Sequence, residues 1–232
     1  MMQTSIRESL LRIQERIANA AARSGRRAED ITLIGVSKTH PAIAIQEAYQ
    51  AGVRHFGENR VQEWEVKRVG TNNLAATWHL IGHLQSNKAA KAAKLFHTVD
   101  SVDDFALAQK LDRARAEVTS SGKLRVLLEV RMEQEGTKSG VEIEALPGLA
   151  ERVAALPHLD LAGLMCIPPY LFETEQARPY FRRLRELRDE LRTKLSLPLP
   201  VLSMGMSHDF EVAIEEGATE ARLGTALFGG RR

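Results

Sequence analysis

The sequence contains very little cysteine, few aromatic residues and no long apolar run. Cys166 is the single cysteine among 232 residues, so no disulfide can form within the chain, which is typical of a reducing compartment. Three tyrosines and two tryptophans offer few rings for stacking on bases, which disfavours RNA recognition. No segment approaches the roughly 18 continuous apolar residues of a membrane-spanning helix. We therefore expect a cytoplasmic protein that binds neither nucleic acid nor membranes.

An excess of charge of one sign is also missing. The 32 Lys and Arg residues stand against 30 Asp and Glu residues, which leaves a net charge of +2. The densest basic run, residues 180–194, is interleaved with acids and has apolar residues at helical spacing, so we expect the solvated outer face of a helix. Residues 1–24 have the pattern of an amphipathic helix and include acids, unlike a signal peptide.

Extended apolar runs and helical patterns alternate along the rest of the chain. Eight strands separated by helices favour an α/β fold in which a parallel sheet closes into a (β/α)8 barrel of the TIM type. The rival fold, an open doubly wound sheet, would carry a glycine-rich fingerprint after an early strand, and "GVSKTHP" is not one. The predicted strands cover residues 31–38, 55–59, 77–83, 97–100, 124–132, 161–167, 201–206 and 221–228.

Nothing in the sequence resembles a linker, an internal repeat or a low-complexity tract. We therefore predict a single domain over residues 1–232, with an N-terminal helix at 1–24 and the barrel at 31–229. The usual eighth barrel helix does not follow the last predicted strand. We expect the N-terminal helix to fill part of its position.

A lysine ends the first predicted strand, "ITLIGVSK". Lys38 has the same alternation parity as Ile34 and Val36, so its amine points into the barrel if they do. Taken alone, Lys38 is better explained as a strand-end lysine whose stem packs on apolar surface while its amine reaches water. Active sites of such barrels lie at the C-terminal ends of the strands, which makes Lys38 a candidate nucleophile.

Polar residues also follow the second and seventh predicted strands. The stretch "FGEN" places Glu58 and Asn59 at a strand end, where a turn acid and a helix cap explain them equally well. The stretch "SMGMSHDF" places Ser207 at an expected helix N-cap, with Asp209 in the first turn. A helix start with free N–H groups and a hydroxyl can bind phosphate, although an ordinary cap has the same residues.

The eighth strand adds a second candidate phosphate contact. Arg222 and Gly224 share one strand face and Thr225 follows, and strands seven and eight often hold phosphate in barrels. Both strands neighbour the first strand in a closed barrel, so the amine of Lys38 would face a phosphate. That pairing indicates a Schiff base to a phosphorylated aldehyde, for which desolvation can keep a lysine neutral. Pyridoxal phosphate is the common cofactor of this kind.

Other candidate groups are weaker. His79 and His83 are predicted on one strand face without a third ligand at a recognisable metal spacing, so we expect packed or hydrogen-bonded histidines. Cys166 is flanked by apolar residues, which indicates an inert thiol. Lys88 and Lys138 lie in polar loops and are either surface lysines or anion contacts.

Taken together, these segments closely resemble the pyridoxal phosphate homeostasis protein family, relatives of the barrel domain of alanine racemase. The resemblance spans nearly the whole chain from residue 31 and rests on the stretches "GVSKTHP", "WHLIGHLQSNK", "HTVDS", "TKSGV", "LAGLMCIPP" and "SMGMSHDFEVAIEEGATEARLGTALFG". It implies an internal aldimine of pyridoxal phosphate at Lys38 and Asn59 beside the ring. It further implies Arg222 near the pyridine nitrogen and phosphate contacts from Ser207, Gly224 and Thr225.

Two positions depart from that family pattern. Arg60 stands where the family commonly has tyrosine, which affects contacts around the rim of the cofactor. Arg131 stands where an asparagine usually follows strand five, which alters charge at the mouth.

The resemblance implies a carrier or buffer of pyridoxal phosphate rather than an enzyme. An arginine beside the pyridine nitrogen disfavours its protonation and weakens the ring as an electron sink. Alanine racemase also takes a catalytic tyrosine from a second domain, which we do not expect in a chain that ends at Arg232. The expected partners are apo-enzymes that need the cofactor. The alternatives are a racemase-like enzyme, a Schiff-base aldolase acting on a sugar phosphate through Lys38, and a scaffold without cofactor.

Overall fold

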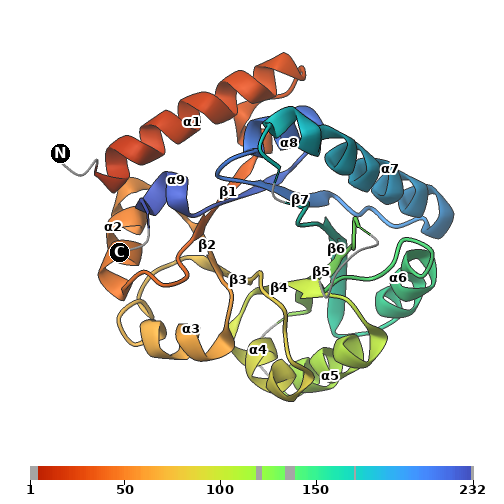
Figure 1. Cartoon of the computed structure of the whole chain (residues 1–232). Helices are drawn as coiled ribbons and strands as arrows, with labels where there is room; N and C mark the ends of the chain where they lie inside the picture. Colours follow the sequence, from red (N-terminus) through yellow and green to blue (C-terminus); the bar gives the residue numbers. More distant parts are fainter. Residues whose placement is uncertain (1–4, 119–121, 134–138, 170, 231–232) are drawn as a thin grey trace.

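The computed structural model describes residues 5–118, 122–133, 139–169 and 171–230. Within these residues the strands pair in parallel in chain order, and β1 closes on β8 to complete a barrel (Figure 1). The predicted (β/α)8 barrel is therefore confirmed. The strands are β1 (Thr32–Val36), β2 (His55–Glu58), β3 (Thr77–Leu80), β4 (Thr98–Val102), β5 (Leu124–Glu129), β6 (Leu159–Met165), β7 (Val201–Met206) and β8 (Glu220–Leu223).

The helices surround the barrel as an outer ring (Figure 1). None of those in the described ranges is both long and apolar enough to cross a bilayer. They are α1 (Ile6–Arg23), α2 (Ala42–Ala51), α3 (Val61–Arg68), α4 (Ala89–Leu95), α5 (Phe105–Ala116), α6 (Leu146–Ala154), α7 (Arg178–Leu195), α8 (Phe210–Glu215) and α9 (Thr225–Phe228). Short 3₁₀ turns cover Ala28–Asp30, Ser86–Lys88 and Thr174–Ala177.

Helix α1 lies on the outside of the barrel between α8 and α2, with α9 beneath it (Figure 1). Ser5 and Glu8 form a reciprocal capping box that satisfies backbone N–H groups at its start. Its apolar stripe is buried against the barrel, and Arg16 forms two hydrogen bonds to Glu211 of α8, of 2.9 and 3.2 Å. As expected, the N-terminal helix fills part of the position of an eighth outer helix, and the short α9 packs beside it.

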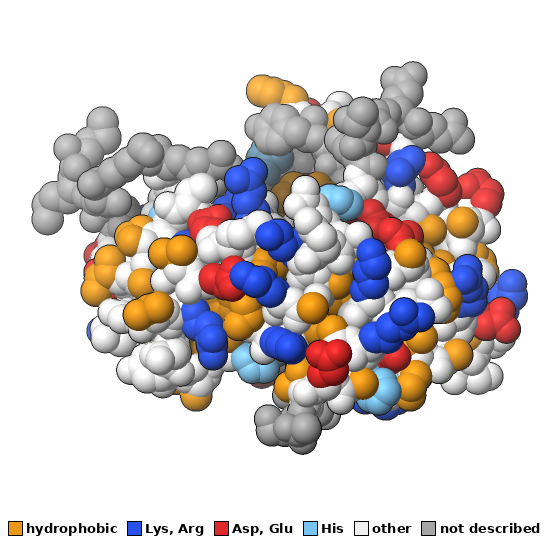
Figure 2. All heavy atoms as spheres, turned by 90° about the horizontal axis from the view of Figure 1, so that it is seen from below, with side chains coloured by type: hydrophobic (Ala, Val, Ile, Leu, Met, Phe, Trp, Pro, Cys, Tyr) orange, Lys and Arg blue, Asp and Glu red, His pale blue; other side chains and the backbone are white. Residues whose placement is uncertain are grey.

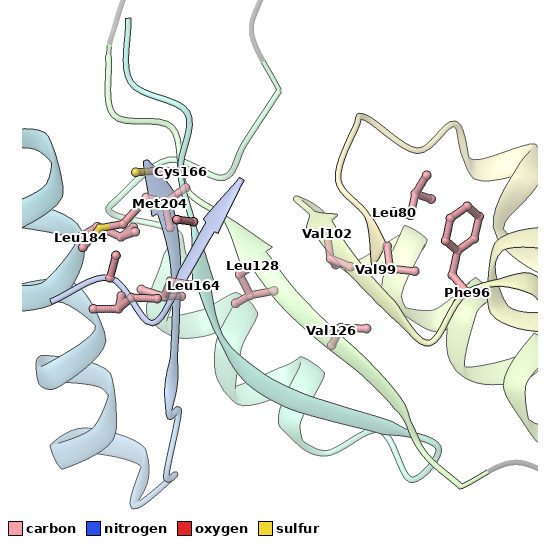
Figure 3. Close-up of a cluster of buried hydrophobic side chains, with 14 of the residues drawn as sticks. Leu80, Phe96, Val99, Val102, Val126, Leu128, Leu164, Cys166, Leu184 and Met204 are labelled. Atoms are coloured by element: carbon pink, nitrogen blue, oxygen red, sulfur yellow. The ribbon is translucent and has the colours of Figure 1, made fainter. Parts of the chain in front are cut away.

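The main core lies between the strands and the surrounding helices. Leu164 of β6 and Met204 of β7 point outward and meet Leu184 of α7 (Figure 3). The predicted amphipathic character of α7 is confirmed, because its apolar stripe is buried while Arg183 pairs with Glu190 on the outer face. Burial of such stripes contributes about 25 cal/mol for each Å² of apolar surface removed from water.

The outer face formed by α3, α4 and α5 carries charges of both signs. Figure 2 shows basic and acidic side chains interspersed there with apolar ones. Ion pairs join neighbouring helices, with Lys91 2.8 Å from Glu65 and Lys94 3.7 Å from Glu117. The mixed charge agrees with the small net charge of the chain.

Charged groups cross the interior of the barrel. Arg125 of β5 donates a 2.5 Å hydrogen bond to Glu220 of β8, and a contact between strands that are not neighbours must pass through the interior. Beside this pair, His79 lies 3.1 Å from Asp100 and 3.0 Å from the ring of His55. Burial and the neighbouring His79 lower the pKa of His55 to about 4, so this ring is neutral at physiological pH.

Several predicted boundaries are wrong. The eighth strand was expected to reach residue 228, but β8 ends at Leu223 and Thr225–Phe228 form a helical turn. Leu227 and Phe228 are buried against the outside of the barrel, and a short apolar run has the same pattern in a strand as in a buried helical turn. The third and fifth strands were expected to reach residues 83 and 132, but β3 ends at Leu80 and β5 ends at Glu129.

Gly205 permits a close approach of α8 to β7. Its φ is +89°, and a Cβ there would lie 2.6 Å from the Cβ of Ala213 and 2.9 Å from the Cα of Phe210. Glycine meets both requirements of this position, because it has no Cβ and adopts a positive φ without strain.

We expect Gly205→Ala to lower the free energy of unfolding by about 2–4 kcal/mol, since left-handed strain and overpacking act together. Gly25→Ala is the matched control, because Gly25 has a φ of +68° but nothing within 4 Å of the added Cβ. Its free energy of unfolding should fall by only about 1–2 kcal/mol, the cost of the left-handed backbone strain alone. Urea unfolding measures both variants, and equal losses would contradict a steric role for Gly205.

Candidate functional site

Closure of the barrel brings the end of β1 against the end of β8. Gly35 of β1 pairs with Leu223 of β8, and a Cβ on Gly35 would point outward, 3.1 Å from Leu227 of α9. The residues on either side of Gly35 therefore face the interior. Lys38 follows Val36 by two residues and is half-buried at the C-terminal mouth of the barrel.

A buried ion pair fixes the backbone immediately before Lys38. The ammonium group of Lys67 lies 2.7 Å from the carbonyl oxygen of Ser37 and 2.9 Å from the carboxylate of Glu58. The Ser37 hydroxyl donates a 2.6 Å bond to the same carboxylate. Burial raises the pKa of Glu58, and the bonds from Ser37 and Lys67 act against that rise. Glu58, at the end of β2, thus fixes the end of β1 through its bonds to Ser37 and Lys67.

The rest of the loop after β1 is held from two sides. The backbone N–H of Thr39, which has a φ of +67°, donates to Glu63, and Glu63 pairs with Lys67 at 2.7 Å. The ring of His40 stacks on Phe228 of α9 with centroids 4.9 Å apart. These contacts tie the Lys38 loop to α3 and to the turn that follows β8.

Ser207 is not the N-cap that the sequence predicted. Helix α8 begins at Phe210 after Asp209, and Asp209 accepts a 2.6 Å bond from the N–H of Met206. The Ser207 hydroxyl instead accepts a 3.1 Å bond from the N–H of Ala226, at the start of α9. The β7 loop and the β8 turn therefore meet, because a tertiary contact replaces the local cap.

Gly224 and Thr225 lie where β8 turns into α9. Gly224 is half-buried and Thr225 is exposed. A Cβ on Gly224 would lie 3.4 Å from the carbonyl oxygen of Val36, two residues before Lys38. The end of β1, the Ser207 loop and the start of α9 thus border one another.

Arg222 is buried in the barrel beneath this turn, with 4% of its surface exposed. One guanidinium nitrogen donates to the hydroxyl of Ser203 on β7 at 2.8 Å, and the other donates to the carbonyl oxygen of Cys166 at 2.7 Å. Charge-assisted hydrogen bonds of this kind fix the orientation of a planar guanidinium. The thiol of Cys166 is buried as well, and burial raises its pKa to about 12, which fits the expected inert thiol.

Asn59 lies on the other side of β1 from these groups. It borders a cavity of about 560 Å³ at the ends of β2 and β3, together with Gln62 and Lys88. A Cβ on Gly82 would lie 2.5 Å from the carbonyl oxygen of Asn59, so this glycine lets the β3 end approach the β2 end. Five of the six predicted site residues lie at or near the ends of β1, β7 and β8, namely Lys38, Ser207, Arg222, Gly224 and Thr225. Asn59 instead borders the cavity on the β3 side.

The remaining sequence candidates are placed as follows. Arg60 is exposed at the N-cap of α3, and Arg131 pairs with Glu142 at the rim. His79 is buried and hydrogen-bonded, as expected for a strand histidine. His83 does not share a strand with it, because β3 ends at Leu80. Lys138 lies outside the described residues.

Several supporting groups were missed in the sequence. Ser203 could have been found from its alternation with Val201, which predicts an inward-facing hydroxyl. Lys67 gave no signal, since a lysine in a helix is normally assigned to the solvated face. Glu129 at the end of β5 was passed over inside an apolar run, although its side chain is buried.

The fold and the site define a (β/α)8 barrel protein that has a lysine after the first strand and polar loops at the same mouth. The chain matches the family described as "Alanine racemase, N-terminal domain" over residues 9–232, and it belongs to that family. The resemblance inferred from the sequence is thereby confirmed.

Close relatives carry a more specific name. A pyridoxal phosphate homeostasis protein of Aquifex aeolicus is 47% identical over 225 residues, covering 97% of this chain and 98% of the relative. One of Pseudomonas aeruginosa is 45% identical over 228 residues, covering 98% and 96%. The structure of PipY from Synechococcus elongatus with pyridoxal phosphate bound is 42% identical, with a TM-score of 0.83, and covers 94% of this chain and 100% of that one.

Lys67→Met tests the ion pair behind Lys38. It leaves the Glu58 carboxylate buried without its cation, so we expect a loss of about 3–5 kcal/mol of unfolding free energy near neutral pH. Burial then raises the pKa of Glu58 further in the folded state alone. When the pKa of an acid is higher in the folded than in the unfolded state, the free energy of unfolding falls as pH rises. The stability lost in Lys67→Met should therefore become smaller on acidification, when the Glu58 carboxyl becomes neutral.

Urea unfolding at about pH 8 and about pH 5 measures this dependence. The double variant Glu58→Gln/Lys67→Met is the control, and it should recover much of the stability and lose the pH dependence. A deficit of the same size at both pH values would contradict the assignment.

Proposed function

We propose that this protein binds pyridoxal phosphate covalently at Lys38 and acts as an intracellular carrier or buffer of that cofactor. The single observation that supports this best is the contact between the loop after β1 and the turn after β8. His40 of that loop stacks on Phe228, and the Val36 carbonyl, two residues before the half-buried Lys38, borders Gly224. Ser207 joins the same turn through its bond from the N–H of Ala226. The structure of the relative PipY contains bound pyridoxal phosphate, which supports the same cofactor for this protein.

The residues present fit the proposed group. The hydroxyls of Ser207 and Thr225 can donate to a phosphate. Gly224 brings no side chain into the space beside the Val36 carbonyl. The nearby carboxyl of Asp209 is engaged by the N–H of Met206, and burial raises its pKa, which lessens repulsion of an anion. Arg222 supplies the buried cation.

In this proposal the amine of Lys38 forms an imine with the aldehyde carbon and one water is released. Ser207, Gly224 and Thr225 hold the phosphate, Asn59 lies beside the ring, and Arg222 faces the pyridine nitrogen. The cofactor would supply electrophilic chemistry at its aldehyde. Glu58 and Lys67 act on the backbone before Lys38 and so position its amine.

A carrier is favoured over an enzyme by Arg222. Its guanidinium is fixed by Ser203 and the Cys166 carbonyl, and a cation there opposes protonation of the pyridine nitrogen. Turnover of amino acids through such a site would be weak. The relatives named above are homeostasis proteins, which supports the same assignment. The recipients would be apo-enzymes in the cytoplasm that require the cofactor.

A visible absorption spectrum followed by borohydride reduction and peptide mass mapping tests the covalent site. We expect a yellow protein whose reduced adduct maps to Lys38, and a loss of both signals in Lys38→Ala. Lys91→Ala, which removes an exposed lysine paired with Glu65, should keep both. An adduct on Lys88 or Lys138 instead would contradict the proposal.

Arg222→Gln tests the role of the guanidinium, because glutamine retains hydrogen bonding without the charge. We expect a shifted absorption band with the Lys38 adduct still present after reduction. Complete loss of the adduct in a folded variant would contradict a role confined to the ring nitrogen.

The carrier assignment is tested with L-alanine and other amino acids. We expect no racemisation or transamination above the background of the free cofactor. Sustained turnover that disappears in Lys38→Ala would favour the racemase-like alternative.

A further inference from the structure

Polar side chains fill the half of the barrel interior that lies away from the mouth. His55 and Glu220 are the first residues of β2 and β8, and Arg125 is the second residue of β5. Parallel strands all begin at one end of a barrel, so these residues lie near the end opposite the site proposed for pyridoxal phosphate. His79 of β3 and Asp100 of β4 belong to the same group, and both are completely buried.

Three of these side chains present metal-binding atoms to one another. One ring nitrogen of His79 and one carboxylate oxygen each of Asp100 and Glu220 all lie within 4.8 Å of one another. Zn²⁺ holds nitrogen and oxygen ligands at about 2.0–2.2 Å, so two of its ligands are at most about 4.4 Å apart. Small side-chain rotations therefore bring the three atoms to bonding distance. One imidazole and two carboxylates form a donor set that suits a divalent transition metal.

Glu220 has an oxygen that is not used within the protein. Only 3% of the residue is exposed, and its Oε1 accepts a 2.5 Å hydrogen bond from Arg125. Its Oε2 is buried and has no hydrogen-bond partner within the described ranges. Arg125 thus orients the carboxylate through one oxygen, as outer hydrogen bonds orient the carboxylates that bind metals, and leaves the other oxygen available.

The contact between His79 and Asp100 can also accommodate a cation. Nδ1 of His79 lies 3.1 Å from Oδ2 of Asp100, and its Nε2 lies 3.0 Å from Nδ1 of His55. The Thr98 hydroxyl donates its single hydrogen to Asp100. When His79 donates from Nε2 to His55, the lone pair on its Nδ1 faces a carboxylate, and a cation between them removes the repulsion. A metal-bound histidine uses its second ring nitrogen as a donor in this way.

A proton and a metal ion differ in how much of this group they satisfy. A proton on Nδ1 of His79 would complete the bond to Asp100, but it would leave Oε2 of Glu220 without a partner. A metal ion among the three side chains would engage all of them. The unused oxygen of Glu220 therefore favours the metal ion.

We propose that His79, Asp100 and Glu220 form a buried structural site for a divalent transition-metal ion such as Zn²⁺, which joins β3, β4 and β8 from inside the barrel. This site goes beyond the proposed function. It requires neither Lys38 nor the cofactor, so the two proposals can fail separately.

Elemental analysis of the full chain tests this site. Protein produced without an affinity tag in medium with added ZnCl₂ and then desalted should retain about one equivalent of Zn²⁺ per chain, and so should Lys38→Ala. Prolonged incubation with EDTA should remove the ion and lower the midpoint of thermal unfolding by about 5 °C or more, because a ligand that binds only the folded state stabilises it.

Two ligand variants and a matched control assign the contacts. Glu220→Gln retains an acceptor for Arg125, and Asp100→Asn changes a second ligand, so the assignment does not depend on one variant. Each should lose the Zn²⁺, and EDTA should no longer change its unfolding midpoint. His83→Gln is the control, because it changes an exposed histidine that lies 3.7 Å from Asp103. It should retain the ion.

Crystals of the unmodified protein grown with ZnCl₂ locate the ion without any variant. We expect a zinc anomalous difference peak among His79, Asp100 and Glu220. The proposal is overturned if the unmodified protein retains no metal, if both ligand variants retain as much as the control, or if the anomalous peaks lie only at the surface. Zn²⁺ that disappears in Lys38→Ala would place the ion at the mouth and would also overturn it. Absence of the Lys38 adduct from a protein that retains the ion would count against the proposed function alone.

Discussion

The hydrogen-bonded pairing of β1 with β8 is the constraint on which the rest of this structure depends. It joins residues almost 190 positions apart in the sequence, from the pair of Thr32 with Glu220 to that of Gly35 with Leu223. Parallel strands end at the same side of a sheet, so closure also collects all eight strand ends at one mouth. Without it, Lys38 would have no fixed relation to Gly224 or to the Ser207 loop. The candidate site is a property of the closed barrel and of no single segment.

Charged groups inside the barrel have to be paired, because moving an ion out of water costs several kcal/mol unless partners compensate. Arg125 with Glu220 and His79 with Asp100 fill the interior below the mouth in this way. Arg222 continues the arrangement upward, but its partners are a hydroxyl and a carbonyl oxygen rather than a carboxylate. Among the described residues no carboxylate forms a direct ion pair with this guanidinium, so its positive charge can attract an anionic or electron-rich group.

The two halves of the mouth differ in chemistry. The half built by β1, β7 and β8 combines an amine and hydroxyls, which is a set of donors suited to a phosphorylated aldehyde. The half built by β3, β5 and β6 contains Glu129 and Arg131, one acceptor and one donor at a cavity with apolar walls. Closure of the barrel therefore gives the mouth two chemically different sides.

The sequence by itself determined the alternation of strands and helices, the barrel and the family. Those features follow from local periodicity and from residues next to strand ends, which a linear pattern records. Only the tertiary structure decided that Ser207 bonds to Ala226 instead of capping α8, that residues after Leu223 form a helical turn, and that Lys67 is buried against Glu58. Each of these depends on which groups meet after closure. A side chain forms its hydrogen bonds with whatever the folded chain brings within about 3 Å, and distance along the sequence does not enter.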